Sequence, residues 1–433
     1  MARWAVATGA SVEGKGGRRA PVPASETGEE AVMSQAIESI QSTQNTPSAP
    51  EILLYPRIRK SPFFYASRRH GVRKYSVYNH HYHPRLYTDP VDEYWALVQG
   101  VTLWDVGVER QIEIAGPDAF AFTQRLVPRD MRHCQVGQCK YVFVTAPDGG
   151  ILNDPVLLRV EENRFWLSLA DSDILLWCRG LTVNSGLEVT LQEVDVAPVQ
   201  VQGPKAKAVM VDLFGEAVLA MPYYHLMEAE LDGMSVVISR TGYSGEIGYE
   251  IYLREASRFG EALWQRVFEA GRPHDMQVIG PCHIRRIEGG ILAFGCDIWY
   301  DTNPFEVGMG YDWMVDLRGD DDFIGRAALE RIKAEGVSRK LVGVEIDGPS
   351  VGYFTDGAMI DVFPVFAAHG ERIGKVTSAT RSPRQERNIG YAMVPVEYAE
   401  LGTPLRIEAN TGPQDAVVVD KPFHDPSKAI PKG

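Results

Sequence analysis

The chain has 433 residues, of which 45% are apolar and 23% charged, a composition typical of globular proteins and not of fibrous or disordered ones. Its formal net charge of −13 argues against a large phosphate-neutralising surface, so we expect no nucleic-acid partner. No apolar run of about 18 residues and no signal-peptide core is evident, which predicts a cytoplasmic protein with no membrane partner. The five cysteines are few and odd in number, which indicates reduced thiols.

The pattern of residue types along the sequence changes twice, and four segments can be distinguished. Residues 1–50 are rich in small and polar residues, which predicts a disordered extension with Met33 as a candidate start. Residues 51–198 and 199–330 both alternate between predicted strands and helices and look like related α+β modules. Residues 331–433 contain short strands with turn signals between them, which predicts a separate small β-barrel. The predicted fold class is therefore α+β with a C-terminal β-barrel.

The first module begins with a well-marked helix. Asp89-Pro90 gives an N-cap and a proline in the first turn, and Gly100 ends the segment, so a helix is predicted over Val91–Gln99. Gly116-Pro117-Asp118 opens another helix in the same way. An antiparallel meander is predicted from the strands Gln111–Ile114, Tyr141–Thr145, Val156–Val160 and Phe165–Leu169.

The second module and the barrel follow the same reasoning. After a strand beginning at Val199, Gly203-Pro204 opens a helix. The further elements expected in this module are strands Ser235–Ser239 and Tyr249–Leu253 and helices Ala256–Glu269 and Ile284–Phe294. After Gly325 hardly any helix is expected, and the predicted barrel strands are Leu341–Ile346, Arg372–Thr377, Ile389–Val394, Pro404–Ile407 and Ala416–Val419.

Three histidines lie close together at His80, His81 and His83. On a strand, His81 and His83 would share one face and could begin a metal site. No carboxylate or cysteine lies at a supporting spacing, so a polar pocket lining or a turn before Pro84 is the favoured interpretation. We predict no metal.

Two carboxylates attract attention for different reasons. Asp154 lies in Gly149-Gly150-Ile-Leu-Asn-Asp-Pro155, where a buried carboxylate would need a partner; an Asx-turn before the proline is an equal alternative. Alternation places Glu250 and Tyr252 on the face opposite Tyr249. Glu250 could then accept two parallel hydrogen bonds from a planar ring, or it could lie on a solvated strand face.

The predicted helix Ile284–Phe294 carries Arg285 within pairing reach of Glu288, and Arg286 follows Arg285. Its isoleucines recur at three- and four-residue spacing and face inward. Arg286 could therefore contact an anionic ligand, or the helix could be a surface helix with ion pairs. The sequence contains no P-loop, nucleophile-elbow or zinc-protease signature, so none of these common motifs indicates its function.

Several motifs occur in the order typical of one family. They are Val201-Gln-Gly-Pro204, Arg240-Thr-Gly-Tyr-Ser-Gly-Glu-Ile-Gly-Tyr-Glu250, Arg286-Ile-Glu288, Gly374-Lys-Val-Thr-Ser378, Ser382-Pro383 and Asn388-Ile-Gly390. From about Ser61 to Phe423 the chain resembles the T-protein (aminomethyltransferase) of the glycine cleavage system and its tetrahydrofolate-dependent relatives. The resemblance implies domains arranged around a central folate-binding hole, with tetrahydrofolate as cosubstrate.

The resemblance also implies roles for individual residues. Asp154 matches an aspartate beside the reactive side of the pterin, and Tyr243 and Glu250 match residues that contact the pterin. Arg286 matches the second arginine of the family's Arg-Asp-x-Leu-Arg-Leu-Glu stretch, although Cys282 and His283 replace the first pair.

The front of the chain, with Ser61-Pro-Phe-Phe64 and Tyr78-Asn-His80, resembles the demethylase branch of the family. We therefore expect methyl transfer from a small donor to N5 of tetrahydrofolate. The histidines His80, His81 and His83 and Tyr243 would suit a leaving phenolate, which favours the O-methyl group of a methoxylated aromatic acid as donor. The alternatives are a dimethylsulfoniopropionate demethylase, an aminomethyltransferase of glycine cleavage and a non-catalytic folate-binding protein.

Overall fold

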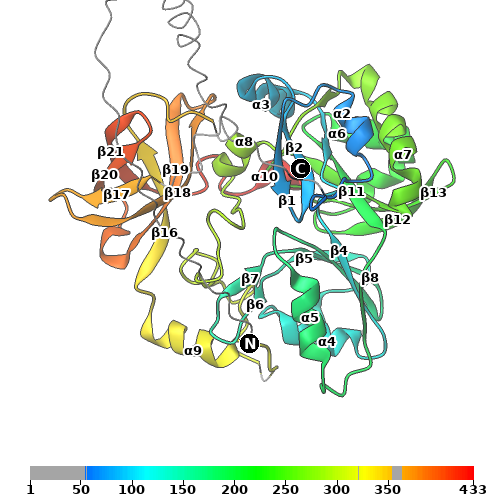
Figure 1. The fold of residues 1–433 in the computed structure, drawn as a ribbon, viewed down its shortest axis with the longest axis horizontal. Helices are drawn as coiled ribbons and strands as arrows, with labels where there is room; N and C mark the ends of the chain where they lie inside the picture. Colours follow the sequence, from blue (N-terminus) through cyan, green and yellow to red (C-terminus); the bar gives the residue numbers. More distant parts are fainter. Residues whose placement is uncertain (1–53, 55, 320, 354–362) are drawn as a thin grey trace, which may run out of the picture. The chain divides into compact units, whose positions relative to one another are not determined.

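The computed structural model describes residues 54, 56–319, 321–353 and 363–433. The predictions for residues 1–50, Met33 included, lie outside these residues. The described part of the chain contains a five-stranded sheet, a six-stranded sheet, two two-stranded sheets and a closed six-stranded barrel (Figure 1). The predicted fold class, α+β with a C-terminal β-barrel, is confirmed.

The six-stranded sheet has the order β12-β13-β14-β11-β3-β15, and only the pair β15–β3 is parallel. Its strands are β3 (Thr102–Asp105), β11 (Val196–Gln202), β12 (Leu226–Leu231), β13 (Met234–Ser239), β14 (Gly248–Arg254) and β15 (Gln277–Val278). Helices α6 (Ala206–Phe214) and α7 (Ala256–Gly271) cover one face (Figure 1). There Val209 and Trp264 join Val199 and Ile251 in a hydrophobic core, and burial of each such side chain stabilises the fold by about 2 kcal/mol.

The five-stranded sheet is the predicted antiparallel meander, with the order β10-β4-β9-β8-β5. Its strands are β4 (Gln111–Ala115), β5 (Gln138–Tyr141), β8 (Val156–Glu161), β9 (Arg164–Ser168) and β10 (Thr190–Glu193), and helices α4 (Ala119–Leu126) and α5 (Ile174–Thr182) pack on it. The strand predicted over residues 141–145 is divided in two. β6 (Val144–Thr145) leaves this sheet to pair with β7 (Ile151–Asn153), and Val142 and Phe143 are buried in two different cores.

The remaining elements before the barrel are short. They are α2 (Phe64–Arg68), β1 (Lys74–Tyr78), β2 (His81–Leu86), α3 (Pro90–Gln99), α8 (His283–Glu288) and the 3-10 helices η1 (Met131–His133), η2 (Glu216–Ala220) and η3 (Arg272–His274). The predicted cap of α3 is confirmed, because Asp89 accepts a hydrogen bond from the Val91 amide at 2.9 Å. The helix predicted over residues 284–294 ends at Glu288, because Gly290 adopts the left-handed region at φ +70°.

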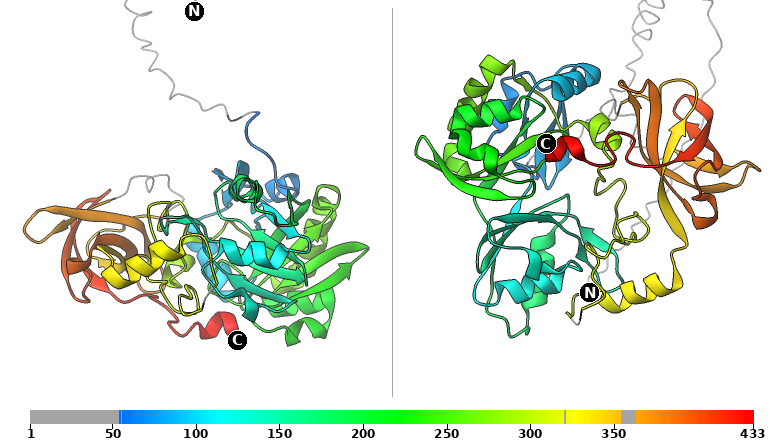
Figure 2. Two further views of the ribbon diagram at one scale, coloured as in Figure 1. Left: turned by 90° about the horizontal axis from the view of Figure 1, so that it is seen from below. Right: turned by 180° about the vertical axis from the view of Figure 1, so that it is seen from behind.

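The barrel closes in the order β16-β19-β18-β17-β20-β21. Its strands are β16 (Arg339–Ile346), β17 (Pro364–Ala367), β18 (Arg372–Ser382), β19 (Arg387–Pro395), β20 (Pro404–Ala409) and β21 (Gly412–Val419), followed by α10 (Ala429–Lys432), with η6 (Val396–Tyr398) between β19 and β20. All five predicted strands are confirmed, whereas β17 was not expected. The expectation of hardly any helix after Gly325 is wrong, because α9 (Arg326–Glu335) runs directly into β16 (Figure 2).

The predicted domain boundaries stay predictions. The boundary at residue 199 falls within β11, and the boundary at residue 330 falls within α9. In addition, β3, from the first predicted module, pairs with β11 and β15 in the six-stranded sheet. The two predicted modules therefore share a sheet.

Candidate functional site

Asp154 lies in the short connection between β7 and β8. Its Oδ2 atom accepts a hydrogen bond from the Tyr141 hydroxyl at 2.9 Å. Its Oδ1 atom is buried and has no hydrogen-bond partner among the described residues. Burial raises the pKa of Asp154 to about 7, while the Tyr141 bond lowers it and the nearby Asp297 raises it. A buried acceptor without a partner is costly, so Oδ1 is a candidate contact for a ligand N–H.

Glu250 is buried at the centre of the six-stranded sheet, opposite Gln200 of β11 and Ser239 of β13. The predicted alternation is confirmed, since Tyr249 faces the core under α6 and α7 while Tyr252 packs on the opposite face. Burial raises the pKa of Glu250, and four hydrogen-bond donors lower it.

Those donors limit what else Glu250 can bind. Its Oε1 atom accepts a bond from Gln200 at 2.7 Å, and Oε2 accepts bonds from Thr241 at 2.8 Å and Tyr252 at 2.5 Å. Each carboxylate oxygen accepts about two bonds, so only Oε1 has capacity left. Two parallel bonds to a ring would require Thr241 or Tyr252 to turn away.

A third acid, Glu109, was not singled out from the sequence. It lies in the turn between β3 and β4, and its Oε2 atom accepts a hydrogen bond from Ser168 at 2.7 Å. Burial, followed by the charges of Glu250 and Asp154, raises the pKa of Glu109 to about 8, although the Ser168 hydrogen bond lowers it. Glu109 is therefore close enough to Asp154 and Glu250 for their charges to act on it, and we call these three residues the acid cluster.

Two tyrosines border the acid cluster. Tyr243, in the loop before β14, donates a hydrogen bond from its hydroxyl to the Leu292 carbonyl at 3.2 Å. Burial raises its pKa, and the charges of Asp297 and Asp154 contribute. Tyr78, at the end of β1, has its pKa raised by burial and then by Glu109, Asp154 and Tyr243. The charge of Asp154 thus acts on both Tyr243 and Tyr78, while the contact of Tyr243 with a pterin stays a prediction.

The histidines are distributed differently from what their spacing suggests. His83 is buried, and its ring packs against Tyr78, with 5.3 Å between the ring centroids. Its two ring nitrogens have no hydrogen-bond partner among the described residues, and burial holds its pKa well below the usual value, so the ring is neutral. His81 contacts the Asn79 carbonyl at 2.7 Å, and burial together with Arg59 lowers its pKa to about 4. His80 is exposed in the turn before β2. Within the described residues, no group of three or more side chains is arranged to hold a metal ion.

Arg286 is fully buried, so the alternative of a surface ion-pair helix is wrong for α8. Its guanidinium donates to Asp297, to Ser378 of the barrel at 2.6 Å and to the Ile291 carbonyl at 3.1 Å. Its remaining N–H groups face His283. These contacts use the N–H donors of Arg286 and connect α8 to the barrel. The contact of Arg286 with folate stays a prediction, and it is not favoured because these donors already have partners.

The fold and the motifs define a family. Residues 63–319 match the GCVT N-terminal domain, and residues 339–425 match the glycine cleavage T-protein C-terminal barrel domain. The chain belongs to the glycine cleavage T-protein family, whose members use tetrahydrofolate as a cosubstrate.

Individual relatives divide between two activities. The chain is 34% identical over 362 residues to dimethylsulfoniopropionate demethylase DmdA of Ruegeria pomeroyi, covering 84% of this chain and 96% of the relative. It is 32% identical over 341 residues to an aminomethyltransferase of Bacillus subtilis, covering 77% and 90%. The aminomethyltransferase T structure from Bartonella henselae has the same fold, with a TM-score of 0.74 at 24% identity over 84% of this chain and 98% of that one.

The part of the chain that the structure describes has no helix long and apolar enough to cross a membrane. The cytoplasmic location stays a prediction.

Proposed function

We propose that the protein transfers a methyl group from a small methylated acid to N5 of tetrahydrofolate. The observation that carries this proposal is the buried Oδ1 atom of Asp154, which has no partner among the described residues and belongs to a carboxylate whose charge reaches a second buried acid, Glu109. A reduced pterin presents several N–H groups, and the free acceptor positions of the acid cluster fit such a ligand. Asp154, Glu250 and Tyr243 are the residues that would hold it.

The chain's own contribution is positioning and electrostatics. When bound, tetrahydrofolate supplies the nucleophilic nitrogen that receives the methyl group. Asp154 would stabilise positive charge that develops beside it, and such an effect contributes about 3 kcal/mol in a site shielded from water. Oδ1 of Asp154 is also the buried acceptor available for the proton that leaves the nitrogen. Tyr141 fixes the other oxygen of the same carboxylate.

We favour a sulfonium carboxylate as donor over the methoxylated aromatic acid that the sequence suggested. When the carbon–sulfur bond of a sulfonium breaks, its electron pair leaves with a neutral thioether, so no general acid is needed. A leaving phenolate profits from a proton donor, yet His83 is neutral and His81 turns its Nδ1 to a backbone carbonyl. The acid cluster and the rings of Tyr78 and Tyr243 would also stabilise a cationic donor. The similarity to dimethylsulfoniopropionate demethylase supports the same choice.

The direct test is incubation of the full chain with tetrahydrofolate and dimethylsulfoniopropionate, with a panel of methoxybenzoates in parallel. We expect 5-methyltetrahydrofolate from the sulfonium donor. Product from methoxybenzoates alone would restore the aryl-ether donor. Release of ammonia from an aminomethylated carrier protein, without methyl transfer from any donor, would favour the aminomethyltransferase instead. Tight folate binding with neither activity would indicate a non-catalytic folate-binding protein.

Changing Glu250 to Gln is expected to weaken tetrahydrofolate binding about tenfold while changing kcat less than threefold. The reason is that its bonds to the ring would be equal in the ground and transition states, so that their loss acts on affinity. Titration calorimetry measures the affinity, and Glu228→Gln, an exposed change on β12 of the same sheet, is the matched control. An unchanged dissociation constant would remove Glu250 from the site.

Turnover is expected to rise with pH through about 7 and then level off. Burial raises the pKa of Asp154 to about 7, so the charged form that acts electrostatically is lost below that value. At one unit below the pKa the rate should be about tenfold lower than the plateau. Single-turnover rates between about pH 5.5 and 9 measure this profile, and Asp154→Asn should lack the rise. A wild-type profile that is flat over this range would contradict the assignment.

A further inference from the structure

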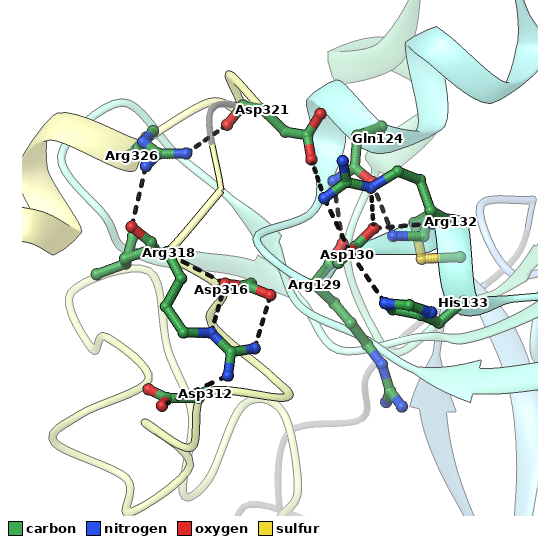
Figure 3. Close-up of polar contacts among 12 residues, drawn as sticks. Gln124, Arg129, Asp130, Arg132, His133, Asp312, Asp316, Arg318, Asp321 and Arg326 are labelled. Carbon is green, nitrogen blue, oxygen red and sulfur yellow. Dashed lines mark hydrogen bonds and ion pairs between the residues drawn. The ribbon is translucent and has the colours of Figure 1, made fainter.

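Arg129 stands apart from the ion pairs around it. Arg132 binds Asp130 and Asp321, and Arg318 binds Asp316. Figure 3 shows these pairs together, whereas the guanidinium of Arg129 points away from them. Among the described residues, no carboxylate lies within ion-pair distance of Arg129.

Arg129 is nevertheless held in place. One of its N–H groups donates to the Tyr141 carbonyl at 2.9 Å, and its guanidinium lies over the Trp313 ring at 5.0 Å. Trp313 in turn stacks on Tyr311 at 5.6 Å with an angle of 7° between the rings. Burial lowers the pKa of Arg129. A fixed guanidinium with unused N–H groups is pre-organised for a planar carboxylate.

Lys140 provides a second cation beside it. It precedes Tyr141 on β5, and its ammonium donates to the Gln138 side chain at 3.1 Å. In the described parts of the chain Lys140 has no ion-pair partner. Burial lowers its pKa, and the charge of Arg129 contributes to that shift. Two neighbouring cations without acidic partners are unexpected in a chain of net charge −13.

Tyr141 connects Arg129 to Asp154. Its backbone carbonyl binds Arg129, and its hydroxyl binds Asp154. The two contacts are separated by the length of one tyrosine side chain. A ligand with a carboxylate at one end and its reacting group at the other could therefore contact Arg129 while reaching toward Asp154.

We propose that Arg129 and Lys140 form a subsite that binds a carboxylate of a ligand whose other end lies at Asp154. The inference rests on the proposed function and deepens it by naming the residues that would recognise a carboxylate. The carboxylate belongs either to the methyl donor or to the glutamate of tetrahydrofolate. Trp313 positions the guanidinium of Arg129.

The experiment compares Arg129→Gln and Lys140→Met with Arg125→Gln, an exposed arginine on α4. In the donor arm, KM and kcat are measured for dimethylsulfoniopropionate and for its amide, which lacks the carboxylate charge. In the folate arm, calorimetry measures the dissociation constants of tetrahydrofolate and tetrahydropteroate, which lacks the glutamate. We expect Arg129→Gln to raise KM for the acid about tenfold, with kcat and the KM for the amide unchanged.

Each result has a distinct meaning. A loss of affinity for tetrahydrofolate but not for tetrahydropteroate would support the subsite with the glutamate as its occupant. Values for both variants equal to those of Arg125→Gln in every arm would overturn the subsite. If the wild-type chain turns over no donor, the proposed function fails. Calorimetry of dimethylsulfoniopropionate alone then still tests the subsite, because binding that Arg129→Gln abolishes supports it and binding that no variant changes overturns it.

Discussion

Asp154→Asn is expected to reduce turnover by about 100-fold or more while changing the dissociation constant of tetrahydrofolate less than threefold. The substitution keeps the shape of the side chain and its contact with Tyr141 but removes the charge that acts as the methyl group arrives. Loss of one such electrostatic contact costs about 3 kcal/mol in the transition state. Single-turnover formation of 5-methyltetrahydrofolate measures the rate. The matched control is Asp232→Asn, in an exposed turn, and an Asp154→Asn rate equal to the control rate would remove Asp154 from the reaction.

Asp154→Asn is not expected to destabilise the folded protein. The pKa of Asp154 is raised from 3.8 to about 7 in the folded protein, so the folded state holds a proton that the unfolded chain releases. This contribution to stability is fully present below about pH 4 and is lost as the pH rises through about 7. Asparagine has no proton to lose. Its melting temperature should therefore exceed that of the wild type at pH 8 and match it near pH 4.

Asp297→Ala is expected to lower the free energy of unfolding by about 3–5 kcal/mol, because it leaves the buried guanidinium of Arg286 without its charge partner. Asp297 is itself buried, and it accepts hydrogen bonds from Thr377 and Ser378 of the barrel at 2.6 Å each. The substitution therefore also loosens the attachment of α8 to β18. Urea denaturation followed by circular dichroism measures the change.

A second aspartate–arginine pair provides the control. Asp301 lies 3.4 Å from Arg339, but its side chain is 69% exposed. Surface pairs of this kind contribute about 0–1 kcal/mol, so Asp301→Ala should change the free energy of unfolding by no more than that. Equal decreases in the free energy of unfolding of the two variants would show that burial does not increase the contribution of the Asp297–Arg286 pair.

The elements that the sequence predicted are those with a local signal. The α3 helix has its cap, proline and glycine in the sequence. The barrel strands are short and are separated by turn residues. The helix α9 escaped prediction, since only Ala328 and Leu329 are buried and its charged residues carry little apolar pattern. The strand β17 is four residues long and gains its definition from pairing with β18 and β20.

The residues of the candidate site also differ in whether the local sequence reveals them. Asp154 and Glu250 stood out because a carboxylate within an apolar stretch is unusual. Glu109 did not, since Glu109 followed by Arg110 looks like an ordinary polar turn, and only Ser168, almost 60 residues away, reveals that it points inward. The catalytic role of the three histidines stays a prediction. Their spacing is visible in the sequence, whereas the lowered pKa values of His81 and His83 depend on burial that the sequence does not display.

The adjacency of β3 and β11 has a practical consequence for dissecting this family. Asp105 of β3 lies opposite Val199 of β11, so the chain leaves the six-stranded sheet and returns to it on neighbouring strands, about 5 Å apart. The intervening stretch forms the five-stranded sheet and carries Asp154, Arg129 and Lys140, while Glu250 stays behind. This stretch can be exchanged as one unit, because the two points where it joins the six-stranded sheet lie on adjacent strands. Chimeras that exchange residues 106–195 between a demethylase and an aminomethyltransferase would test whether the choice of one-carbon donor follows this stretch of the chain.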